Sequence, residues 1–262
     1  MSSIGARIGN VLRKVLPPAV VAPVIGYANL VLGERELTVV KILCSTTGTS
    51  IDVGANYGSY TYFLRRNSGR CIAFEPNPMC ASFLRAAYSG LEVNQIALSD
   101  HEQLARFFIP GSMDSIENTL GRLRAPGEAD SGQPGVSFEV QTRPLDAFNL
   151  ADVRFIKIDT EGHERHVLRG AIKTVELCHP RMIIECEERH SPGALAAVLD
   201  ILLPLGYVAF VRTGRRYLSF RTAEDGYGTG KANNFLFIHS GDTLLESAKA
   251  AKYGFVLRDE PT

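Results

Sequence analysis

Short apolar, β-branched runs alternate along this chain with segments that have apolar residues at helical spacing. The run at residues 49–54 ends in glycine and precedes a helical pattern at 57–66, which predicts a strand, a tight turn and a helix. Because strands and helices alternate, we expect a parallel sheet with helices on both faces, joined by right-handed crossovers. Further strands are predicted over 70–75, 91–98, 155–159 and 181–186, and helices over 76–88, up to about 178 and over 193–203.

Two regions depart from this alternation. Extra strands are predicted at 105–110 and 136–142, on either side of a Gly-, Pro- and charge-rich stretch at 121–135 that we expect to be a loop or lid. Strands at 207–211 and 233–238, separated by a hairpin and a Gly-rich turn at 226–230, predict antiparallel pairing at the end of the sheet. We therefore expect a helical arm over 1–48 and one domain over 49–262, with an inserted β/loop region at about 105–143.

Composition narrows the possible partners and location. Twenty-eight Lys and Arg residues balance 28 Asp and Glu residues over 262 residues, so no broad cationic face for nucleic acid is expected. The five cysteines form no CxxC pair and are expected to be small buried side chains in a reducing cytoplasm.

The N-terminal arm contains an uncharged apolar stretch over 15–33, which three prolines and a glycine interrupt. We therefore predict no transmembrane span, and expect the arm to dock on the domain or to form a homodimer. Because Arg7, Arg13 and Lys14 precede the stretch, weak contact with a membrane surface is the alternative.

The turn after the first strand, Asp52-Val-Gly-Ala-Asn-Tyr-Gly58, lies where open α/β sheets bind ligands. Gly54 and Gly58 would let the backbone approach a ligand, and Asp52 and Asn56 would supply polar partners. The spacing differs from a G-x-G-x-x-G dinucleotide motif, because Asn56 stands where a second glycine would admit a pyrophosphate. The turn therefore favours a small, positively charged ligand over a diphosphate.

Glu75 ends the second strand, 23 residues after Asp52. From this position an acid can accept hydrogen bonds from both ribose hydroxyls of an adenosine. Together, the glycine turn and Glu75 predict a ligand that carries an adenosine.

Five motifs in this order resemble those of the FkbM-type S-adenosylmethionine-dependent methyltransferases. They are Ile51–Gly58, Phe74–Pro78, Ala97–Asp100, Ile156–Glu164 and Ile183–Glu185, and the resemblance covers about Ser50 to Arg189. It implies a Rossmann-like class I methyltransferase fold with seven main strands, helices on both faces and an antiparallel last strand. It also implies methylation of a hydroxyl, often on a sugar or a polyketide.

The resemblance also implies roles for individual residues toward S-adenosylmethionine. Residues of the turn after the first strand would surround the methionine part and the ribose. Residues at the end of the second strand would hold and flank the ribose, and two apolar residues further along the chain would lie against the adenine. These three groups are Asp52, Gly54, Ala55, Asn56 and Gly58; Glu75, Pro76 and Asn77; and Ala97 and Leu98.

Acidic residues end the fourth and fifth predicted strands. Asp159 and Glu185 would point into one crevice if these parallel strands are neighbours, with Glu161 and His163 close by. Such a group of titratable side chains suits removal of a proton from an acceptor hydroxyl, so we predict these four as the catalytic set. Lys157, inside the fourth strand, is expected to reach the sheet edge or to pair with an acid.

Two alternatives remain open for these acids. Asp159 with Glu185 or Glu187 could offer oxygen ligands to Mg²⁺, which would lower the pKa of the acceptor hydroxyl. A metal-free general base with a supporting acid would look the same in sequence. Glu161 could also simply face the N-terminus of the following helix.

The predicted function is transfer of a methyl group from S-adenosylmethionine to a hydroxyl of a sugar or oligosaccharide. Asn233 and Asn234, at the start of the last long strand, are placed to hydrogen-bond such an acceptor. The alternatives are a polyketide or lipid-linked hydroxyl as acceptor, and a non-catalytic nucleotide- or sugar-binding module. A nicotinamide oxidoreductase is disfavoured because the middle glycine of its motif is missing.

Overall fold

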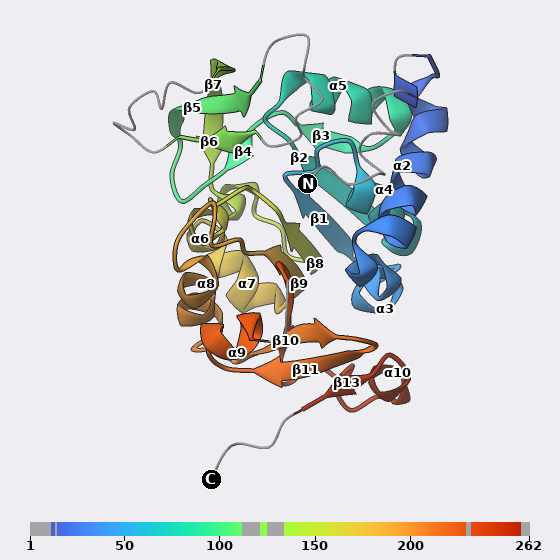
Figure 1. The fold of residues 1–262 in the computed structure, drawn as a ribbon, viewed down its shortest axis with the longest axis vertical. Coiled ribbons are helices and arrows are strands. Elements are labelled where there is room, and N and C mark those ends of the chain that lie inside the picture. The colour runs from blue at the N-terminus through green and yellow to red at the C-terminus, as the bar shows by residue number, and fades with distance from the viewer. Residues whose placement is uncertain (1–11, 14, 112–120, 125–133, 229–231, 258–262) are drawn as a thin grey trace.

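A computed structural model describes residues 12–13, 15–111, 121–124, 134–228 and 232–257 of the chain (Figure 1). Its main sheet has nine strands in the order β13-β11-β10-β12-β9-β8-β1-β2-β3. The five strands at one end are parallel to one another, as the alternation of strands and helices predicts. They are β1 (Thr49–Val53), β2 (Arg70–Phe74), β3 (Glu92–Asn94), β8 (Val153–Ile158) and β9 (Arg181–Glu185).

The C-terminal strands complete the sheet by antiparallel pairing. Strand β12 (Asn234–His239) lies between β9 and β10 (Tyr207–Thr213) and is antiparallel to both. This confirms the Rossmann-like sheet with an antiparallel last strand. Two further strands, β11 (Arg216–Phe220) and β13 (Phe255–Val256), extend it beyond the seven expected strands.

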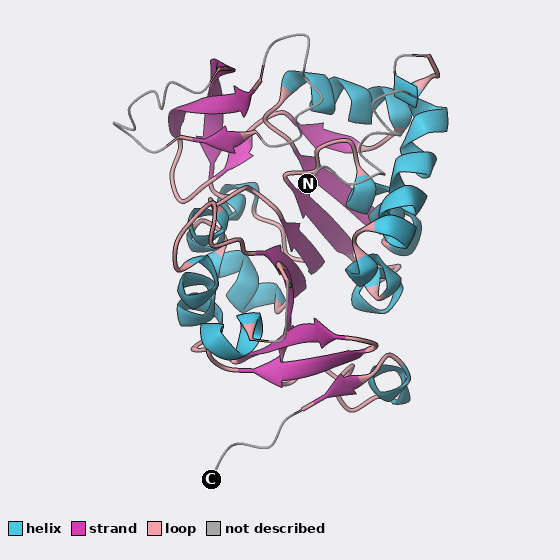
Figure 2. Ribbon diagram, in the orientation of Figure 1, coloured by secondary structure: helices cyan, strands magenta, loops and turns pink. Residues whose placement is uncertain are grey.

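Helices cover both faces of the main sheet (Figures 1 and 2). Successive side chains of a strand point to opposite faces, and Phe155 and Ile156 of β8 accordingly belong to two different buried clusters. The Ile156 cluster packs under α6 (Glu164–Arg169), α7 (Ile172–Cys178) and α8 (Ala194–Leu202). The Phe155 cluster packs under η1 (Arg35–Thr38), α3 (Val40–Leu43) and α4 (Ser59–Asn67).

The inserted region forms a second, four-stranded sheet in the order β4-β7-β5-β6. Its strands are β4 (Ala97–Leu98), β5 (Gln103–Pro110), β6 (Arg122–Leu123) and β7 (Gly135–Arg143). The single strand expected over 91–98 was wrong, because its two halves pair with different partners: β3 with β2, and β4 with β7. Of the loop or lid expected over 121–135, residues 125–133 lie outside the described residues.

The Gly-rich turn expected over 226–230 is also partly wrong. Helix α9 (Ala223–Tyr227) occupies its beginning, because the Thr222 hydroxyl accepts a hydrogen bond from the backbone N–H of Asp225, 3.2 Å away, and caps the helix. Residues 229–231 lie outside the described part. A last short helix, α10 (Ala248–Lys252), precedes β13.

The N-terminal arm folds onto its own domain. Helix α2 (Pro18–Leu32) packs on α4 and on α5 (Pro78–Ala87), with Val21 and Ala22 fully buried. None of the helices in the described residues is long and apolar enough to cross a bilayer.

Candidate active site

A cavity of about 220 Å³ lies at the carboxyl ends of β1, β2 and β8. Its wall is built from the turns after these three strands, from β4, and from the arm, which contributes Arg13, Ile25, Asn29 and Glu34. The arm thus closes one side of the cavity. This is the edge of the sheet at which open α/β proteins bind ligands.

The turn after β1 depends on glycine for its path. Gly54 has a φ of 74°, and a Cβ added there would lie 1.8 Å from the carbonyl oxygen of Asp159. Gly58 has a φ of 84°, and its added Cβ would meet Leu84 at 2.8 Å. Glycine is therefore required at position 54 by close packing on the Asp159 backbone and is favoured at position 58 by the left-handed φ. Gly58 is not among the described residues that line the cavity.

Glu75 ties the turn after β1 to the end of β2. Its Oε2 accepts a hydrogen bond from the backbone N–H of Asn56 at 2.7 Å, and its Oε1 accepts one from the backbone N–H of Asn77 at 2.8 Å. Burial raises the pKa of this carboxyl to about 7. Each carboxylate oxygen can accept a second hydrogen bond, so the side chain still has acceptor capacity toward the cavity.

Asn77 has a structural role as well as its place in the cavity wall. Its Oδ1 accepts a hydrogen bond from the backbone N–H of Met79 at 3.0 Å and caps α5. Pro78 occupies the first position of that helix, where its missing N–H is not needed. The cap fixes the direction in which the chain leaves β2.

Asp52 also borders the cavity, but one of its oxygens is engaged elsewhere. Its Oδ2 accepts a hydrogen bond from the Thr61 hydroxyl of α4 at 2.5 Å. The side chain is 2% exposed, and burial raises its pKa to about 6.

Lys157 is a buried cation at the centre of the site. Its Nζ donates a hydrogen bond to Asn234 Oδ1 at 2.8 Å and lies 4.0 Å from Glu185 Oε2 and 5.0 Å from the centre of the Tyr60 ring. Burial acts to lower the pKa of Lys157, but nearby carboxylates, Asp159 foremost, raise it above its ordinary value. The lysine is therefore charged, and the predicted pairing with an acid is confirmed.

Asp159 and Glu185 meet as adjacent parallel strands require. The charge of Asp159, followed by burial, raises the pKa of Glu185 well above its usual range, so Glu185 keeps its proton beside Asp159. Asp159 lies in the cavity wall, whereas Glu185 is not among the described lining residues and stands behind it.

Two cavity groups could not be found from the sequence. Glu34 Oε2, from the arm, and the Tyr60 hydroxyl of α4 are buried, and apart from each other neither has a hydrogen-bond partner among the described residues. Burial raises the pKa of Glu34 to about 7. Buried polar atoms without partners in a cavity wall are the groups that a bound molecule would satisfy.

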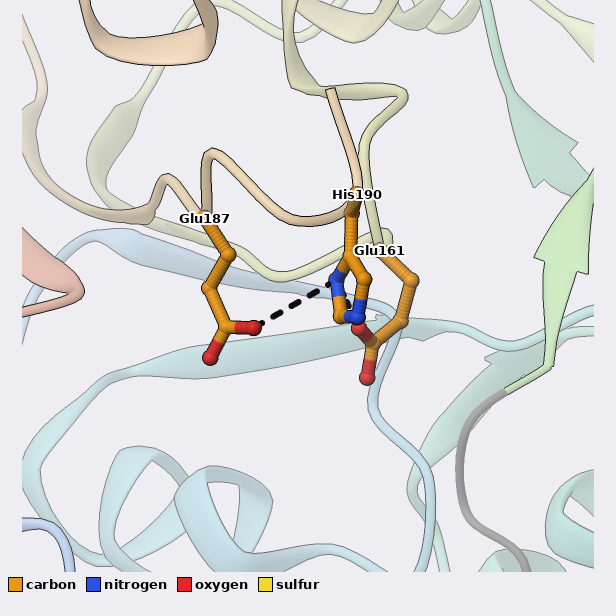
Figure 3. Close-up of side chains that lie close together, drawn as sticks. All are labelled: Glu161, Glu187 and His190. Atoms are coloured by element: carbon orange, nitrogen blue, oxygen red, sulfur yellow. Dashed lines mark ion pairs between the residues drawn. The ribbon is translucent and has the colours of Figure 1, made fainter. Parts of the chain in front are cut away.

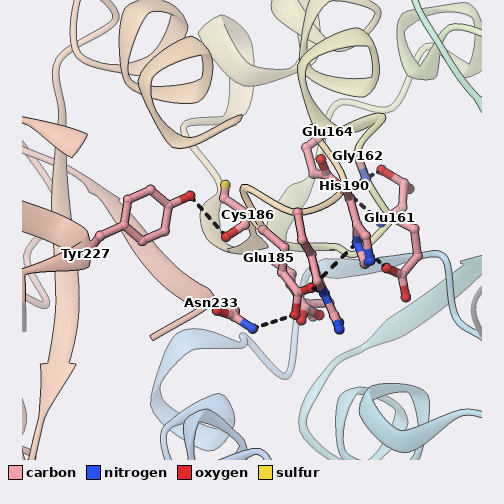
Figure 4. Close-up of polar contacts among 12 residues, drawn as sticks. Glu161, Gly162, Glu164, Glu185, Cys186, His190, Tyr227 and Asn233 are labelled. Atoms are coloured by element: carbon pink, nitrogen blue, oxygen red, sulfur yellow. Dashed lines mark hydrogen bonds and ion pairs between the residues drawn. The ribbon is translucent and has the colours of Figure 1, made fainter. Parts of the chain in front are cut away.

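Glu161 belongs to a second group of side chains, formed where the loops after β8 and β9 meet (Figure 3). His190 Nδ1 lies 2.6 Å from Glu161 Oε2 and 3.6 Å from Glu187 Oε2. Asn233, labelled beside this group in Figure 4, donates a hydrogen bond from its amide to Glu187 Oε1. Burial and then the charge of Asp159 raise the pKa of Glu161 to about 8.

Glu164 organises the loop that carries Asp159 and Glu161. Its Oε1 accepts hydrogen bonds from the backbone N–H groups of Thr160 at 3.1 Å and Gly162 at 3.0 Å. The side chain is buried, and burial raises its pKa. Glu161 adopts a left-handed φ of 54° in this loop.

His163 also lies in the cavity wall. Its Nε2 is 2.9 Å from the Ser99 hydroxyl, and its ring stacks on that of His166 with centroids 4.6 Å apart. Burial lowers the pKa of His163 to about 4, so it is neutral near pH 7.

A comparison with family models matches residues 52–209, more than half of the chain, to the methyltransferase FkbM domain. This chain belongs to the FkbM methyltransferase family. The match confirms the family that the sequence motifs resemble. A search of curated proteins gives no match.

Several solved structures are similar to this FkbM-family chain at low sequence identity. The FkbM methyltransferase of Methylobacillus flagellatus KT is 16% identical, with a TM-score of 0.49, over 90% of this chain and 58% of that one. SMU.1697c from Streptococcus mutans, in complex with SAH, is 9% identical with a TM-score of 0.44, over 78% and 94% of the two chains. The precorrin-6y C5,15-methyltransferase of Geobacter metallireducens GS-15 is 14% identical with a TM-score of 0.39, over 78% of this chain and 85% of that one. The chain thus spans less than two thirds of the Methylobacillus protein.

The cavity wall of this FkbM-family protein suits S-adenosylmethionine by its chemistry. The described lining includes every residue predicted to bind the cofactor except Gly58. Acidic side chains outnumber basic ones in this wall, which favours a sulfonium cation over a diphosphate. Glu75 offers acceptors for ribose hydroxyls, and Ala97 and Leu98 offer an apolar surface for an adenine. The individual binding roles stay predictions.

Three of the four predicted catalytic residues lie in the cavity wall. Asp159, Glu161 and His163 line the cavity, with Glu185 behind Asp159. Among the described residues, the group of three side chains placed to hold a metal ion is Glu161, Glu187 and His190, which shares only Glu187 with the predicted Mg²⁺ set. The catalytic roles and the Mg²⁺ site at Asp159, Glu185 and Glu187 stay predictions.

Proposed function

We propose that this FkbM-family chain is an S-adenosylmethionine-dependent O-methyltransferase that acts on a hydroxyl of a sugar or oligosaccharide. The observation that carries the proposal is the position of Asp159. Its carboxylate lies in the same cavity wall as the β1 turn and Glu75, with Lys157 also in that wall and Glu185 behind it.

In this proposal Glu75 holds the two ribose hydroxyls through the free acceptor capacity of its oxygens. The backbone N–H groups of Asn56 and Asn77 keep the carboxylate in place for this contact. S-adenosylmethionine, when bound, supplies a methyl group on a sulfonium sulfur. The chain's part is to align the acceptor oxygen with that methyl group and to remove the acceptor's proton.

Asp159 is the proposed general base. Its carboxylate accepts the proton of the acceptor hydroxyl while the new carbon–oxygen bond forms, a contribution of about 10²- to 10⁴-fold in rate for a well-placed base. Glu185 cannot take this role near pH 7, because its raised pKa keeps it protonated. Lys157 balances the charge of the carboxylates that surround it.

The cavity also supports an uncharged, hydroxyl-rich acceptor. Glu34 Oε2 can accept a hydrogen bond and the Tyr60 hydroxyl can donate or accept one, and apart from each other both are without partners among the described residues. The acidic wall disfavours an acceptor that carries a carboxylate or a phosphate near the reacting hydroxyl. A polyketide or lipid-linked hydroxyl is the alternative acceptor.

The test uses transfer of a radiolabelled methyl group to a panel of oligosaccharides, polyketides and lipid-linked sugars. We expect Asp159→Asn to bind the demethylated cofactor nearly as well as wild type and to lose turnover by about 10²-fold or more. The control Asp146→Asn changes a carboxyl that caps α7 from outside the cavity. Normal turnover by Asp159→Asn would contradict the assignment, and labelling only of carboxylates or amines would contradict the acceptor class.

We also propose that the protein is a cytoplasmic homodimer that pairs through α2. Val20, Val24, Tyr27 and Val31 recur at helical spacing on α2 and are 39–72% exposed. Weak contact of this stripe with a membrane surface is the alternative. In sedimentation, we expect the wild type to be a dimer and Val24→Asp to be a monomer. A wild type that is monomeric and floats with lipid vesicles would contradict pairing.

A further inference from the structure

We propose that Glu161, Glu187 and His190 form a binding site for a divalent transition-metal ion at the rim of the cavity. The three side chains come from two separate loops, the one after β8 and the one after β9, which approach each other at this point (Figure 3). One oxygen from each carboxylate and one nitrogen of the imidazole lie within 4.8 Å of one another. Three donors thus converge on one small volume.

The donor spacing suits a common metal ion. Bonds of about 2.0–2.2 Å from one ion place neighbouring ligand atoms roughly 3.0–3.5 Å apart. His190 Nδ1 lies 3.6 Å from Glu187 Oε2, close to this range, and 2.6 Å from Glu161 Oε2. An ion would therefore need the imidazole and the Glu161 carboxylate to separate by roughly 0.4–0.9 Å, a change within reach of side-chain rotation.

The ligand types select the class of ion. An imidazole nitrogen beside two carboxylates suits Mn²⁺, Fe²⁺, Co²⁺ or Zn²⁺, whereas Mg²⁺ and Ca²⁺ favour sites made of oxygen alone. Two carboxylates with a neutral imidazole also match the charge of a divalent cation. This site differs from the predicted Mg²⁺ site, since Asp159 and Glu185 already have the Lys157 ammonium beside them.

Contacts outside the three ligands hold them in place. The Asn233 amide donates to Glu187 Oε1, which leaves Oε2 directed at His190. A Cβ added to Gly162 would lie 3.2 Å from the carbonyl oxygen of His190, so the two ligand-bearing loops are in close contact. Hydrogen-bonded partners of this kind orient metal ligands and tune their affinity.

The cation that now faces Glu187 is a weak competitor. The Arg189 guanidinium is ion-paired with Glu187 Oε2, but its side chain is 60% exposed to solvent. The Glu187 side chain is 9% exposed, so solvent screens this pair only at its arginine end. A divalent ion held by three ligands would displace the guanidinium from this oxygen.

The site is open toward the proposed reaction. Glu161 lines the cavity, and three protein ligands leave coordination positions for water or a substrate oxygen. The use of such a position to hold an acceptor hydroxyl and lower its pKa rests on the proposed function. Binding of the ion itself does not.

The test is Co²⁺ binding to the untagged, chelator-treated full chain. Two signals report the binding: visible absorption of the bound Co²⁺ and a rise in the melting temperature of the protein. We expect one Co²⁺ ion per chain, and loss of both signals in Glu187→Gln and in His190→Gln. Asn233→Ala should weaken binding by about 10- to 100-fold, as loss of an orienting partner does. Arg189→Gln should strengthen binding about two- to fivefold, because it removes the competing cation.

The matched control is His239→Gln. The rings of His179 and His239 stack with centroids 4.0 Å apart in a surface pocket, and such a pair could bind Co²⁺ by itself. His179 precedes β9, whereas Glu187 and His190 follow it, so this pocket lies at the opposite end of the strand from the proposed site. Co²⁺ binding that survives in both Glu187→Gln and His190→Gln but is lost in His239→Gln would overturn the proposal. Absence of Co²⁺ binding to the wild type would also overturn it.

Calorimetry with the demethylated cofactor on the same samples separates this proposal from the previous one. If the chain binds the cofactor but no Co²⁺, the metal site is wrong and the methyltransferase proposal stands. If Co²⁺ binds through these three residues but no acceptor is methylated, the metal site stands and the proposed reaction is wrong. Circular dichroism of each variant shows whether the fold is retained, and the gain expected for Arg189→Gln is an outcome that misfolding would not produce.

Discussion

The pKa of Glu75 predicts how cofactor binding should depend on pH. In the protein without cofactor, burial raises this pKa from an ordinary value of 4.5 to about 7. The proposed contact with two ribose hydroxyls needs the ionised carboxylate, which accepts but does not donate hydrogen bonds. Because the ionised form binds, affinity should rise with pH up to about 7 and then level off.

The expected size of the effect follows from the fraction that is ionised. At pH 5, two units below the pKa, about 1% of Glu75 is charged, and affinity for the demethylated cofactor should be about 100-fold lower than at pH 8. At 1.36 kcal/mol per unit this is roughly 2.7 kcal/mol. Glu34 titrates in the same range and adds to the slope, so the contribution of Glu75 is the difference between wild type and Glu75→Gln.

The assay is isothermal titration calorimetry with the demethylated cofactor between pH 5 and pH 8. Glu75→Gln should bind weakly at pH 8 and show a much flatter pH profile. The control is Glu92→Gln on β3, whose carboxylate is exposed and pairs with Arg70 outside the cavity. Equal slopes in wild type and Glu75→Gln would refute the reasoning, because the titrating group would then not be Glu75.

Three further predictions concern stability. Gly54→Ala should destabilise the fold by more than about 1 kcal/mol in chemical denaturation, because its Cβ would overlap the carbonyl oxygen of Asp159, just after β8. The control Gly90→Ala has a similar φ of 76° but open space around the added Cβ, and should cost less. Equal losses of stability in the two variants would contradict the packing argument. Lys157→Met should cost about 3–5 kcal/mol at pH 8 and less at pH 5, because Glu34 and Asp52, whose pKa values burial raises to about 7 and about 6, are then protonated. A loss independent of pH would count against the buried charge cluster. The pKa of Asp52 is raised to about 6 on folding, so the folded state retains a proton that the unfolded chain releases; stability should fall as pH rises from about 4 to 6, and Asp52→Asn should reduce that fall in thermal melts.

Residues at strand ends were predictable from the sequence. Parallel strands meet at one edge of the sheet with their carboxyl ends together, so Glu75 and Asp159 could be placed there from the alternation of strands and helices alone. The pairing of β8 with β9 then brings Glu185 to Asp159. Local pattern was sufficient because the topology of such sheets is strongly restricted.

Contacts between distant segments were not predictable. Glu34 reaches the cavity because α2 packs on α4 and α5, an arrangement that no local pattern in the arm indicates. His190 lies in a loop, and its meeting with Glu161 depends on the left-handed turn at Glu161. The sequence showed many acids and histidines near these strand ends, but not which of them converge.

The central claim is that a cationic methyl donor with an adenosine binds across the β1 turn. A crystal structure of the chain soaked with the demethylated cofactor tests this most directly. The account predicts ribose hydroxyls within hydrogen-bond distance of Glu75, adenine against Ala97 and Leu98, and the sulfur facing Asp159. Adenosine density elsewhere on the chain, or a ribose that makes no contact with Glu75, would contradict it.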